Sequence, residues 1–300
     1  MAGSAICRAL NANGYNNQLI ATRQELNLTE SVEVDSWFRD KKPDVVVLAA
    51  AKVGGILANK NFPADFLLDN LKIQNNVIEA AWRHGVRRLL FLGSSCIYPK
   101  FAEQPIKEES LLKGALEPTN EWYAVAKIAG IQLCRALRLQ HNFDAISLMP
   151  TNLYGPGDNY HPSHSHVMAA LIRRFTEAAR NGASEVTCWG TGSPKREFLH
   201  VDDLADAAVF CLEKWAYDPN NNDSAFLNVG TGTDISIKEL AKCIAKATGF
   251  EGKIEWDTNK PDGTPRKLLD VSRLSAMGWQ ASITLEKGIQ KVINELPEEF

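Results

Sequence analysis

One pair of residues in this sequence has the side-chain types and the spacing of an acid–base couple. Tyr123 is followed four positions later by Lys127, and no other tyrosine has a lysine at this distance. Residues i and i+4 of a helix share a face, so the ammonium can lie near the phenol. A nearby cation favours the phenolate and lowers the pKa of tyrosine. The pair predicts proton transfer near neutral pH, although the pattern alone also arises by chance.

Two further reactive side chains follow the strand-length apolar run Arg88–Gly93. Ser94 and Cys96 are two residues apart, so on an extended strand end they would point to the same side. Open α/β sheets bind ligands at the carboxyl ends of their strands. A serine at that edge can hydrogen-bond a substrate carbonyl oxygen. A cysteine there is either a small packing residue or a proton-transfer group.

The elements that must position these side chains form an alternating pattern. The runs Asp44–Ala51, Arg88–Gly93 and Ala145–Met149 are apolar on both faces, which is typical of buried parallel strands. Helix-like stretches such as Asn75–His84 lie between them. The pattern predicts an α/β fold with a doubly wound parallel sheet of the Rossmann type.

The local amino-acid composition changes near residue 155, where Gly, Pro, Asn and His become frequent. We therefore expect two units. Residues 1–155 form the dinucleotide-binding domain, with returning segments near 186–215, and residues 156–300 form mainly a smaller C-terminal substrate lobe. A helix is expected from Val167 to about Arg180.

Composition excludes several classes of protein. The 300 residues include 33 Lys+Arg and 36 Asp+Glu, a net charge of −3, and 45% are hydrophobic. Such values predict a globular protein with no nucleic-acid partner reached through bulk charge. No apolar run approaches the ~20 residues of a membrane span. The six cysteines contain no Cys-x-x-Cys pair and no signal peptide precedes them, so we expect a cytoplasmic protein.

The N-terminal segment carries a partial cofactor signal. A Rossmann sheet begins with a strand and a glycine-rich turn that opens a helix. Gly3 fits only the last glycine of that turn, so the fold is expected to be N-terminally truncated, with weak cofactor affinity and low stability. The segment Gln18–Thr22 is expected to be a second strand. Arg23 lies 20 residues beyond Gly3, where an arginine accommodates a 2′-phosphate, which favours NADP over NAD.

Seven segments taken together resemble the GDP-L-fucose synthase family of extended short-chain dehydrogenases/reductases. The resemblance runs from Gly3 to the last helices, and only the first strand and first two glycines of the cofactor turn are missing. The segments that carry it are Leu48–Ile56, Leu92–Pro99, Glu117–Lys127, Met149–Pro156, His161–Val167, Arg196–Asp203 and Lys260–Lys267.

The resemblance implies an NADPH-dependent conversion of GDP-4-keto-6-deoxy-D-mannose to GDP-L-fucose, by 3,5-epimerisation and then 4-keto reduction. It implies that Tyr123 donates a proton to the 4-oxygen, Lys127 lowers the pKa of Tyr123 and binds the nicotinamide ribose, and Ser94 hydrogen-bonds the ketone. By the same resemblance Cys96 is the base and His166 the acid of epimerisation, with ordinary pKa values within reach of neutrality.

The resemblance also assigns binding residues. The residues expected at NADP(H) are Gly3, Arg23, Leu92, Gly93, Ser94, Ser95, Lys127, Pro150, Thr151, Asn152, Leu153 and His166. Arg174, Trp189 and Arg196 are expected near GDP, because guanidinium groups make forked, charge-assisted hydrogen bonds to a diphosphate. Asp262, in a Pro-Asp-Gly turn, faces the sugar nucleotide or serves only the turn.

No metal site is expected. His161, His164 and His166 have a suggestive spacing, but no neighbouring cysteine and only one nearby acid, Asp158, support a metal. The reaction implied above also needs no Lewis acid.

Two other readings remain open. A nucleotide-sugar 4,6-dehydratase or 4-epimerase would share Tyr123 and Lys127, although dehydration usually employs an acidic residue where Cys96 stands. A catalytically impaired remnant without cofactor is the other reading, because the phosphate-binding turn is incomplete. The resemblance further implies a homodimer formed through long helices of the first domain.

Overall fold

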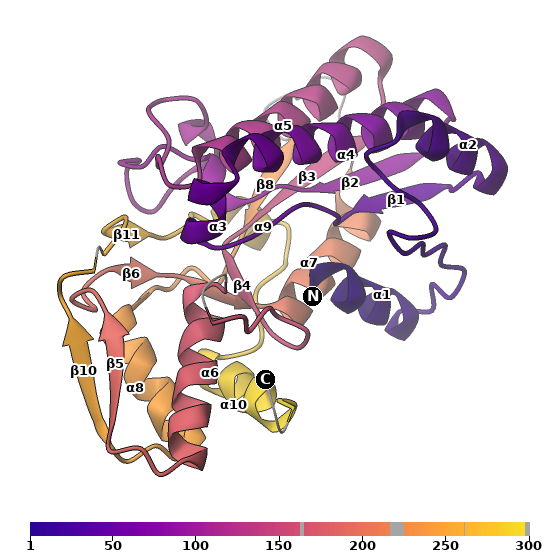
Figure 1. Ribbon diagram of the computed structural model, residues 1–300. Helices are drawn as coiled ribbons and strands as arrows, with labels where there is room; N and C mark the ends of the chain where they lie inside the picture. The colour runs from indigo at the N-terminus through magenta and orange to yellow at the C-terminus, as the bar shows by residue number, and fades with distance from the viewer. Residues whose placement is uncertain (163–164, 217–224, 261, 298–300) are drawn as a thin grey trace.

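A four-stranded parallel sheet forms the centre of the first lobe (Figure 1). The computed structural model describes residues 1–162, 165–216, 225–260 and 262–297. The strand order is β1-β2-β3-β8, with β1 (Val45–Leu48), β2 (Arg88–Leu92), β3 (Ala145–Pro150) and β8 (Phe226–Val229). All three pairings are parallel, so the carboxyl ends of the strands lie at one edge. The predicted fold class and its three strand-length runs are confirmed.

Helices cover both faces of this sheet (Figure 1). One face carries α2 (Ser31–Lys41), α4 (Pro63–Arg83) and α5 (Glu121–His141), and the other carries α1 (Ala2–Ala12) and α7 (Val201–Lys214). The fully buried Leu89 and Phe91 face the first core, and Leu90 faces the second. Covering on both faces explains why β2 and β3 are apolar at successive positions. Within the described residues, no helix has the length and hydropathy to cross a bilayer.

The second lobe has its own core between helices and short strands. Phe175 of α6 packs edge-on against Phe250, and α8 and α10 complete the layer. Its elements are α6 (Val167–Arg180), β5 (Glu185–Trp189) paired with β10 (Lys253–Asp257), β6 (Lys195–Arg196) between β9 (Ile235–Ser236) and β11 (Arg266–Lys267), α8 (Ile237–Thr248) and α10 (Leu285–Asn294). The expected helix from Val167 is present as α6.

Further short elements connect the lobes and fill the loops. The parallel pair β4 (Asn152–Tyr154) and β7 (Phe198–His200) lies between the lobes, and α7 follows β7 back onto the first sheet. Of the range near 186–215 expected to return, α7 packs against α1 and β2, whereas β5 pairs with β10. The strand that returns to the first sheet is β8. The remaining elements are α3 (Ile56–Asn61), α9 (Ser272–Ala276) and the 3₁₀ turns η1 (Ser95–Ile97) and η2 (Glu108–Ser110).

The strand expected at Gln18–Thr22 is not present. This segment has no regular secondary structure, and the side chains of Leu19 and Ile20 are 46% and 69% exposed. A strand exists only through hydrogen bonds to a neighbouring strand, and in the described part of the chain β1 is bonded only to β2. Apolar composition alone therefore misled the prediction here.

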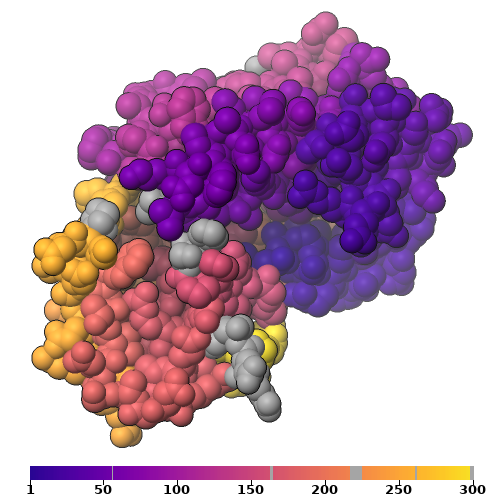
Figure 2. Space-filling view, in the orientation of Figure 1, coloured from indigo at the N-terminus to yellow at the C-terminus, as the bar shows by residue number. Residues whose placement is uncertain are grey.

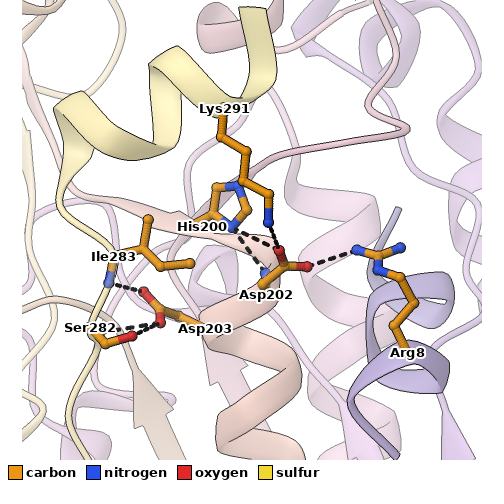
Figure 3. Close-up of polar contacts among 7 residues, drawn as sticks. All are labelled: Arg8, His200, Asp202, Asp203, Ser282, Ile283 and Lys291. Atoms are coloured by element: carbon orange, nitrogen blue, oxygen red, sulfur yellow. Dashed lines mark hydrogen bonds and ion pairs between the residues drawn. The ribbon is translucent and has the colours of Figure 1, made fainter. Parts of the chain in front are cut away.

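Two aspartates at the start of α7 connect three distant helical segments (Figure 3). Asp202 accepts a 2.7 Å hydrogen bond from Arg8 of α1 and forms an ion pair with Lys291 of α10. Asp203 accepts hydrogen bonds from the backbone N–H and the hydroxyl of Ser282, which precedes α10. Acidic residues are also favourable at a helix N-terminus because of the helix dipole. This junction fixes α10 of the second lobe to α1 and α7 of the first.

Candidate active site

Ser94 and Cys96 lie together at the carboxyl end of β2, but not on an extended strand. β2 ends at Leu92, and residues 95–97 form the turn η1, whose N-cap is Ser94. The Ser94 hydroxyl accepts a 3.3 Å hydrogen bond from the Cys96 N–H. The extended geometry predicted for this segment is therefore wrong, because a side-chain cap satisfies the backbone better than a strand end without a partner. The two side chains still meet, since the turn brings positions i and i+2 together.

Gly93 makes this strand end possible. A Cβ atom at this position would lie 2.3 Å from the sulfur of Met149 on the neighbouring strand β3. Leu92 and Ser95, the other residues expected here at the cofactor, are buried on either side. The absence of a side chain at Gly93 thus lets the main chain of the site run directly against β3.

Tyr123 and Lys127 share one face of α5 and point to the same strand end. The ammonium of Lys127 donates a 2.8 Å hydrogen bond to the carbonyl oxygen of Leu92 and lies 5.9 Å from the centre of the Tyr123 ring. Burial lowers the pKa of Lys127 to about 8. The ammonium is therefore close to its titration point at neutral pH.

The expected lowering of the Tyr123 pKa is wrong in this structure. Burial raises the pKa of the phenol, and the negative charge of a Cys96 thiolate raises it further. The cause is desolvation, which disfavours the charged phenolate more than a lysine held by another acceptor can favour it. Tyr123 is consequently a phenol at neutral pH, which suits a proton donor and not a base.

Cys96 is 6% exposed and lies within reach of three charged or polar groups. Burial raises the pKa of its thiol, whereas Lys267, Ser94 and Lys127 oppose the rise. Of these, Lys267 has the largest opposing effect, and its own pKa is lowered by burial while the Cys96 thiolate raises it. Lys267 of β11 is therefore a site residue that the sequence analysis missed. It lies in the segment Lys260–Lys267, but its approach to Cys96 follows from the pairing of β11 with β6, in which it lies opposite Arg196.

His166 lies outside this cluster. It is exposed at the N-cap of α6, and its charged neighbour is Asp158. Among the described residues, His166 is not one of the groups that shift the pKa of Cys96. His161 is exposed in the preceding loop, and His164 lies outside the described residues. No group of three possible metal ligands occurs in the part of the chain that the structure describes.

The segment Pro150–Leu153 leaves β3 at the same edge and enters β4. The hydroxyl of Thr151 and the amide of Asn152 donate hydrogen bonds of 3.2 and 2.8 Å to the carbonyl oxygen of Glu197. Pro150 ends β3, and Leu153 pairs with Leu199 of β7. These bonds hold the segment against the strand that follows Arg196.

The expected cofactor residues of the N-terminal segment lie at two places. Gly3 is in the first turn of α1, where a Cβ atom would lie 3.7 Å from Ala49, the residue after β1. The start of α1 thus faces the carboxyl edge of the sheet, where helix N-termini bind phosphate groups. Arg23 is exposed in the turn 22–25, and no ion pair to it occurs within the described ranges.

Arg174 and Trp189 lie together at the end of β5. The guanidinium of Arg174 donates a 2.6 Å hydrogen bond to the carbonyl of Thr187 and lies 6.0 Å from the Trp189 ring. Lys260, which the sequence analysis did not single out, lies 5.5 Å from the same ring. Trp189 is 62% exposed, so this large aromatic face between two cations is open to a ligand. Figure 2 shows the lobe that carries it, salmon to orange, meeting the indigo-to-magenta lobe across the middle of the view.

Arg196 faces the catalytic cluster from β6. Burial lowers its pKa, and the carboxylate of Glu117 opposes the fall. Arg196 also lowers the pKa of Lys267, so the two cations are neighbours. Glu117, a second residue missed from sequence, accepts hydrogen bonds from Lys100 at 3.1 Å and Thr264 at 2.9 Å.

The carboxylate of Asp262 binds a neighbouring loop. Its two carboxylate oxygens accept the N–H and the hydroxyl of Thr191 at 2.7 and 2.8 Å. Both readings of this residue stay predictions, because these bonds run to the loop 190–193. The bonds also fix the loop 190–193, which connects Trp189 to Arg196.

Comparisons with known proteins agree with this geometry. A family model described as the NAD dependent epimerase/dehydratase family matches residues 1–230. The chain is 57% identical over 291 residues to GDP-L-fucose synthase 1 of Arabidopsis thaliana, covering 97% of this chain and 88% of that protein. It is 54% identical over 293 residues to GDP-L-fucose synthase of Escherichia coli (strain K12), covering 96% and 91%. A solved GDP-mannoheptose C4 reductase from Campylobacter jejuni with NADP bound has a TM-score of 0.90 at 36% identity, covering 98% and 94%.

Proposed function

Since this chain belongs to the NAD dependent epimerase/dehydratase family, and within it to the GDP-L-fucose synthases, we propose that it converts GDP-4-keto-6-deoxy-D-mannose to GDP-L-fucose with NADPH. The observation that carries the proposal is the meeting of Cys96, Tyr123 and Lys127 at one strand end. A thiol beside a phenol–ammonium pair offers both α-proton exchange and ketone reduction. An acidic residue in place of Cys96 would instead favour dehydration.

The donor set at the sheet edge fits NADPH. The start of α1, the glycine-narrowed strand end at Gly93 and the ammonium of Lys127 all face the same edge. Arg23 would meet the 2′-phosphate, Lys127 the nicotinamide ribose, and Pro150–Leu153 the nicotinamide. When bound, NADPH supplies the hydride that reduces the 4-ketone.

Tyr123 is the proton donor of the reduction. Its raised pKa keeps the phenol protonated until negative charge develops on the 4-oxygen. Ser94, the N-cap of η1, is assigned to hydrogen-bond the same oxygen through its hydroxyl. Lys127 stabilises the phenolate that remains and must carry its proton to do so.

Epimerisation requires a base and an acid on opposite faces of the sugar. We assign Cys96 as base: its thiolate removes the α-proton, the electron pair of the C–H bond forms the C=C bond of an enolate, and the π pair of the carbonyl moves onto the 4-oxygen. His166 is assigned as acid and returns a proton to the opposite face. The neighbouring ammonium of Lys267 favours the thiolate of Cys96 and so opposes the effect of burial.

The nucleotide is assigned to the second lobe. The exposed Trp189 supports stacking of the guanine, and Arg174 and Lys260 beside it support binding of phosphate. Arg196 is assigned to the diphosphate near the sugar. Asp262 would act by fixing the loop between Trp189 and Arg196.

A cytoplasmic homodimer is the state we propose for the enzyme. All six cysteines are free, as a reducing compartment maintains them. The packed helices α4 and α5 leave Leu68, Trp122, Val125 and Leu139 exposed, which supports association through this pair. Sedimentation should give a dimer for the native chain and a monomer for Val125→Arg, with NADPH affinity retained.

The function is tested by NMR of GDP-4-keto-6-deoxymannose with the protein in heavy water, with and without NADPH. Deuterium entering C3 and C5, together with NADPH-dependent formation of GDP-fucose, is the expected result. Exchange without reduction would leave the epimerase assignment and remove the reductase. Absence of both, from a protein that a thermal unfolding scan shows to be folded, would overturn the proposal.

A further inference from the structure

Glu197 is a completely buried carboxylate that accepts three backbone hydrogen bonds. Its Oε1 accepts the N–H groups of Thr231 and Gly232 at 2.7 and 2.8 Å, and its Oε2 accepts the N–H of Leu269 at 3.0 Å. No ion pair with Glu197 is found within the described ranges. A buried charge is costly unless it is well hydrogen-bonded, and an apolar residue here would leave the N–H groups of Thr231, Gly232 and Leu269 without this acceptor. The carboxylate therefore holds together main-chain segments that are distant in the sequence.

The segments that meet at Glu197 are those that carry the site. Leu269 lies two residues after Lys267, the cation that acts on the Cys96 thiol. Arg196 directly precedes Glu197 in the sequence, and Arg196 pairs in register with Lys267. Thr151 and Asn152, beside the proposed nicotinamide position, bind the main-chain carbonyl of Glu197. Its side chain thus holds the segment of Lys267, and its backbone holds the cofactor segment, where the Thr151 hydroxyl also acts on the carboxylate.

The turn after β8 is built around the same carboxylate. A Cβ atom at Gly230 would lie 2.2 Å from Oε1 of Glu197, so the main chain approaches the carboxylate more closely than any other residue allows. The N–H groups of the next two residues then donate to it. The turn and the segment of Lys267 are held at a fixed separation by one side chain.

We propose that Glu197 is a positioning residue for proton abstraction: its carboxylate holds the 267–269 segment so that Lys267 stays beside Cys96. The proposal rests on the proposed function, since it names the residue that supports the base of epimerisation. Cofactor binding should depend less on the carboxylate, because Asn152 and Thr151 donate hydrogen bonds to the main-chain carbonyl of Glu197 and only the Thr151 hydroxyl also acts on the carboxylate.

The test uses Glu197→Gln in the full chain. The amide replaces one carboxylate oxygen by an NH₂ group at nearly constant volume. This NH₂ group cannot accept a hydrogen bond from the backbone N–H that it faces, so that hydrogen bond is lost. Deuterium entry at C3 and C5 should fall at least about tenfold, while the NADPH dissociation constant stays within about twofold of the native value. Glu108→Gln is the matched control: Glu108 is also buried and accepts a 3.0 Å bond from the Asn228 N–H. Its exchange rate should stay native.

A double-mutant cycle separates positioning from general loss of structure. If Glu197 acts through Lys267, the variant Glu197→Gln/Lys267→Met should exchange no more slowly than Lys267→Met alone. Additive losses, or a loss of NADPH binding as large as the loss of exchange, would overturn the proposal. If Glu197→Gln does not fold, Glu197→Asp takes its place in the cycle, because it keeps the charge but withdraws it from Leu269.

A second readout does not need the substrate. Alkylation of Cys96 by iodoacetamide, followed by peptide mass spectrometry across pH, reports the titration of this thiol. Glu197→Gln should shift the titration to higher pH, as Lys267→Met does, and the double variant should shift it no further. An unshifted titration would refute the proposal. Failure of the native protein to exchange deuterium would refute the proposed function and leave this titration as the deciding measurement.

Discussion

The catalytic cluster of the first lobe and the nucleotide-facing residues of the second lobe are built in opposite ways. Cys96 and Lys127 are buried at a strand end and on a long helix, and burial shifts the pKa of each. Trp189 and Arg174 lie at the end of a two-stranded ribbon, exposed or half-exposed to solvent. Proton transfer needs groups whose pKa the protein controls, and burial controls it through desolvation and through stronger effects of neighbouring charges. Recognition of a large polar nucleotide needs only accessible faces held in place.

The two regions meet at β6 and β11. Arg196 and Lys267 belong by sequence to the second lobe, yet they are partly buried against the catalytic cluster. This boundary sharpens the comparison, because changes on either side of it should affect different kinetic parameters. Substitutions in the first lobe should lower catalytic rates, and those at the end of β5 should raise KM.

The largest effect is expected for Tyr123→Phe. Removing the phenolic proton donor should lower the rate of GDP-fucose formation by about 10²–10⁴-fold, because the Ser94 hydroxyl assigned to the same oxygen is a far weaker acid than the phenol. Deuterium entry at C3 and C5 should persist. Both rates are read from the same NMR sample, and Tyr15→Phe, which loses only a surface bond to Glu213, is the control. Equal loss of both rates would contradict the division between the two half-reactions.

Cys96→Ser should show the converse behaviour. A serine hydroxyl titrates far above the thiol, so exchange at C3 and C5 should fall by about 10²-fold or more. Binding of NADPH, followed by fluorescence titration, should remain near the native value. Cys188→Ser provides a matched control, because Cys188 is equally buried but lies on β5 of the second lobe. Undiminished exchange in Cys96→Ser would exclude Cys96 as the base.

Trp189→Ala should act on KM. Stacking of a base on an aromatic ring contributes about 1–3 kcal/mol, which corresponds to a rise in KM of roughly tenfold to a hundredfold. The rates at saturating substrate should change little. Trp189→Phe retains an aromatic face and should recover most of the affinity. A large fall in kcat for Trp189→Ala would show that this region takes part in the chemistry as well.

The smallest expected effect is the difference between the pH dependence of reduction and that of deuterium exchange. The pKa of Lys127 is lowered to about 8, so reduction should decline as pH rises through that value and the ammonium is lost. The pKa of Cys96 is raised, so the thiolate fraction and the exchange rate should increase over the same range. Stopped-flow kinetics measure the rate of reduction, and NMR measures the rate of deuterium exchange, both between about pH 6 and 9.5. Lys127→Arg should remove the alkaline decline, and parallel profiles would refute the assignment.

Much of the first lobe could be predicted from sequence because burial on two faces leaves an unambiguous apolar pattern. The runs at 44–51, 88–93 and 145–149 appear as β1, β2 and β3. In the second lobe, the helix expected from Val167 to about Arg180 is present as α6. The run Gln18–Thr22 has similar apolar character but no neighbouring strand. The apolar pattern shows which side chains of a segment can be buried. It does not show whether a neighbouring strand is present to form hydrogen bonds with that segment.

The site shows the same limit at the level of single residues. Tyr123 and Lys127 could be found because helical spacing places them on one face. Lys267 could not, since its approach to Cys96 depends on the pairing of β11 with β6, two strands of two residues each. The direction of the Tyr123 pKa shift could not be predicted from residue spacing either, because it depends on how far the folded chain removes the phenol from water.

The aspartate pair at the start of α7 has a consequence for cooperativity. Asp202 and Asp203 connect α7 to α1 on one side and to α10 and the residues before it on the other. Regions joined in this way tend to open as one unit in native-state amide hydrogen exchange. The amides of α1, α7 and α10 should therefore exchange with a common opening free energy, although α10 belongs to the core of the other lobe. Local unfolding of the substrate lobe should therefore also expose the amides of α1 to exchange.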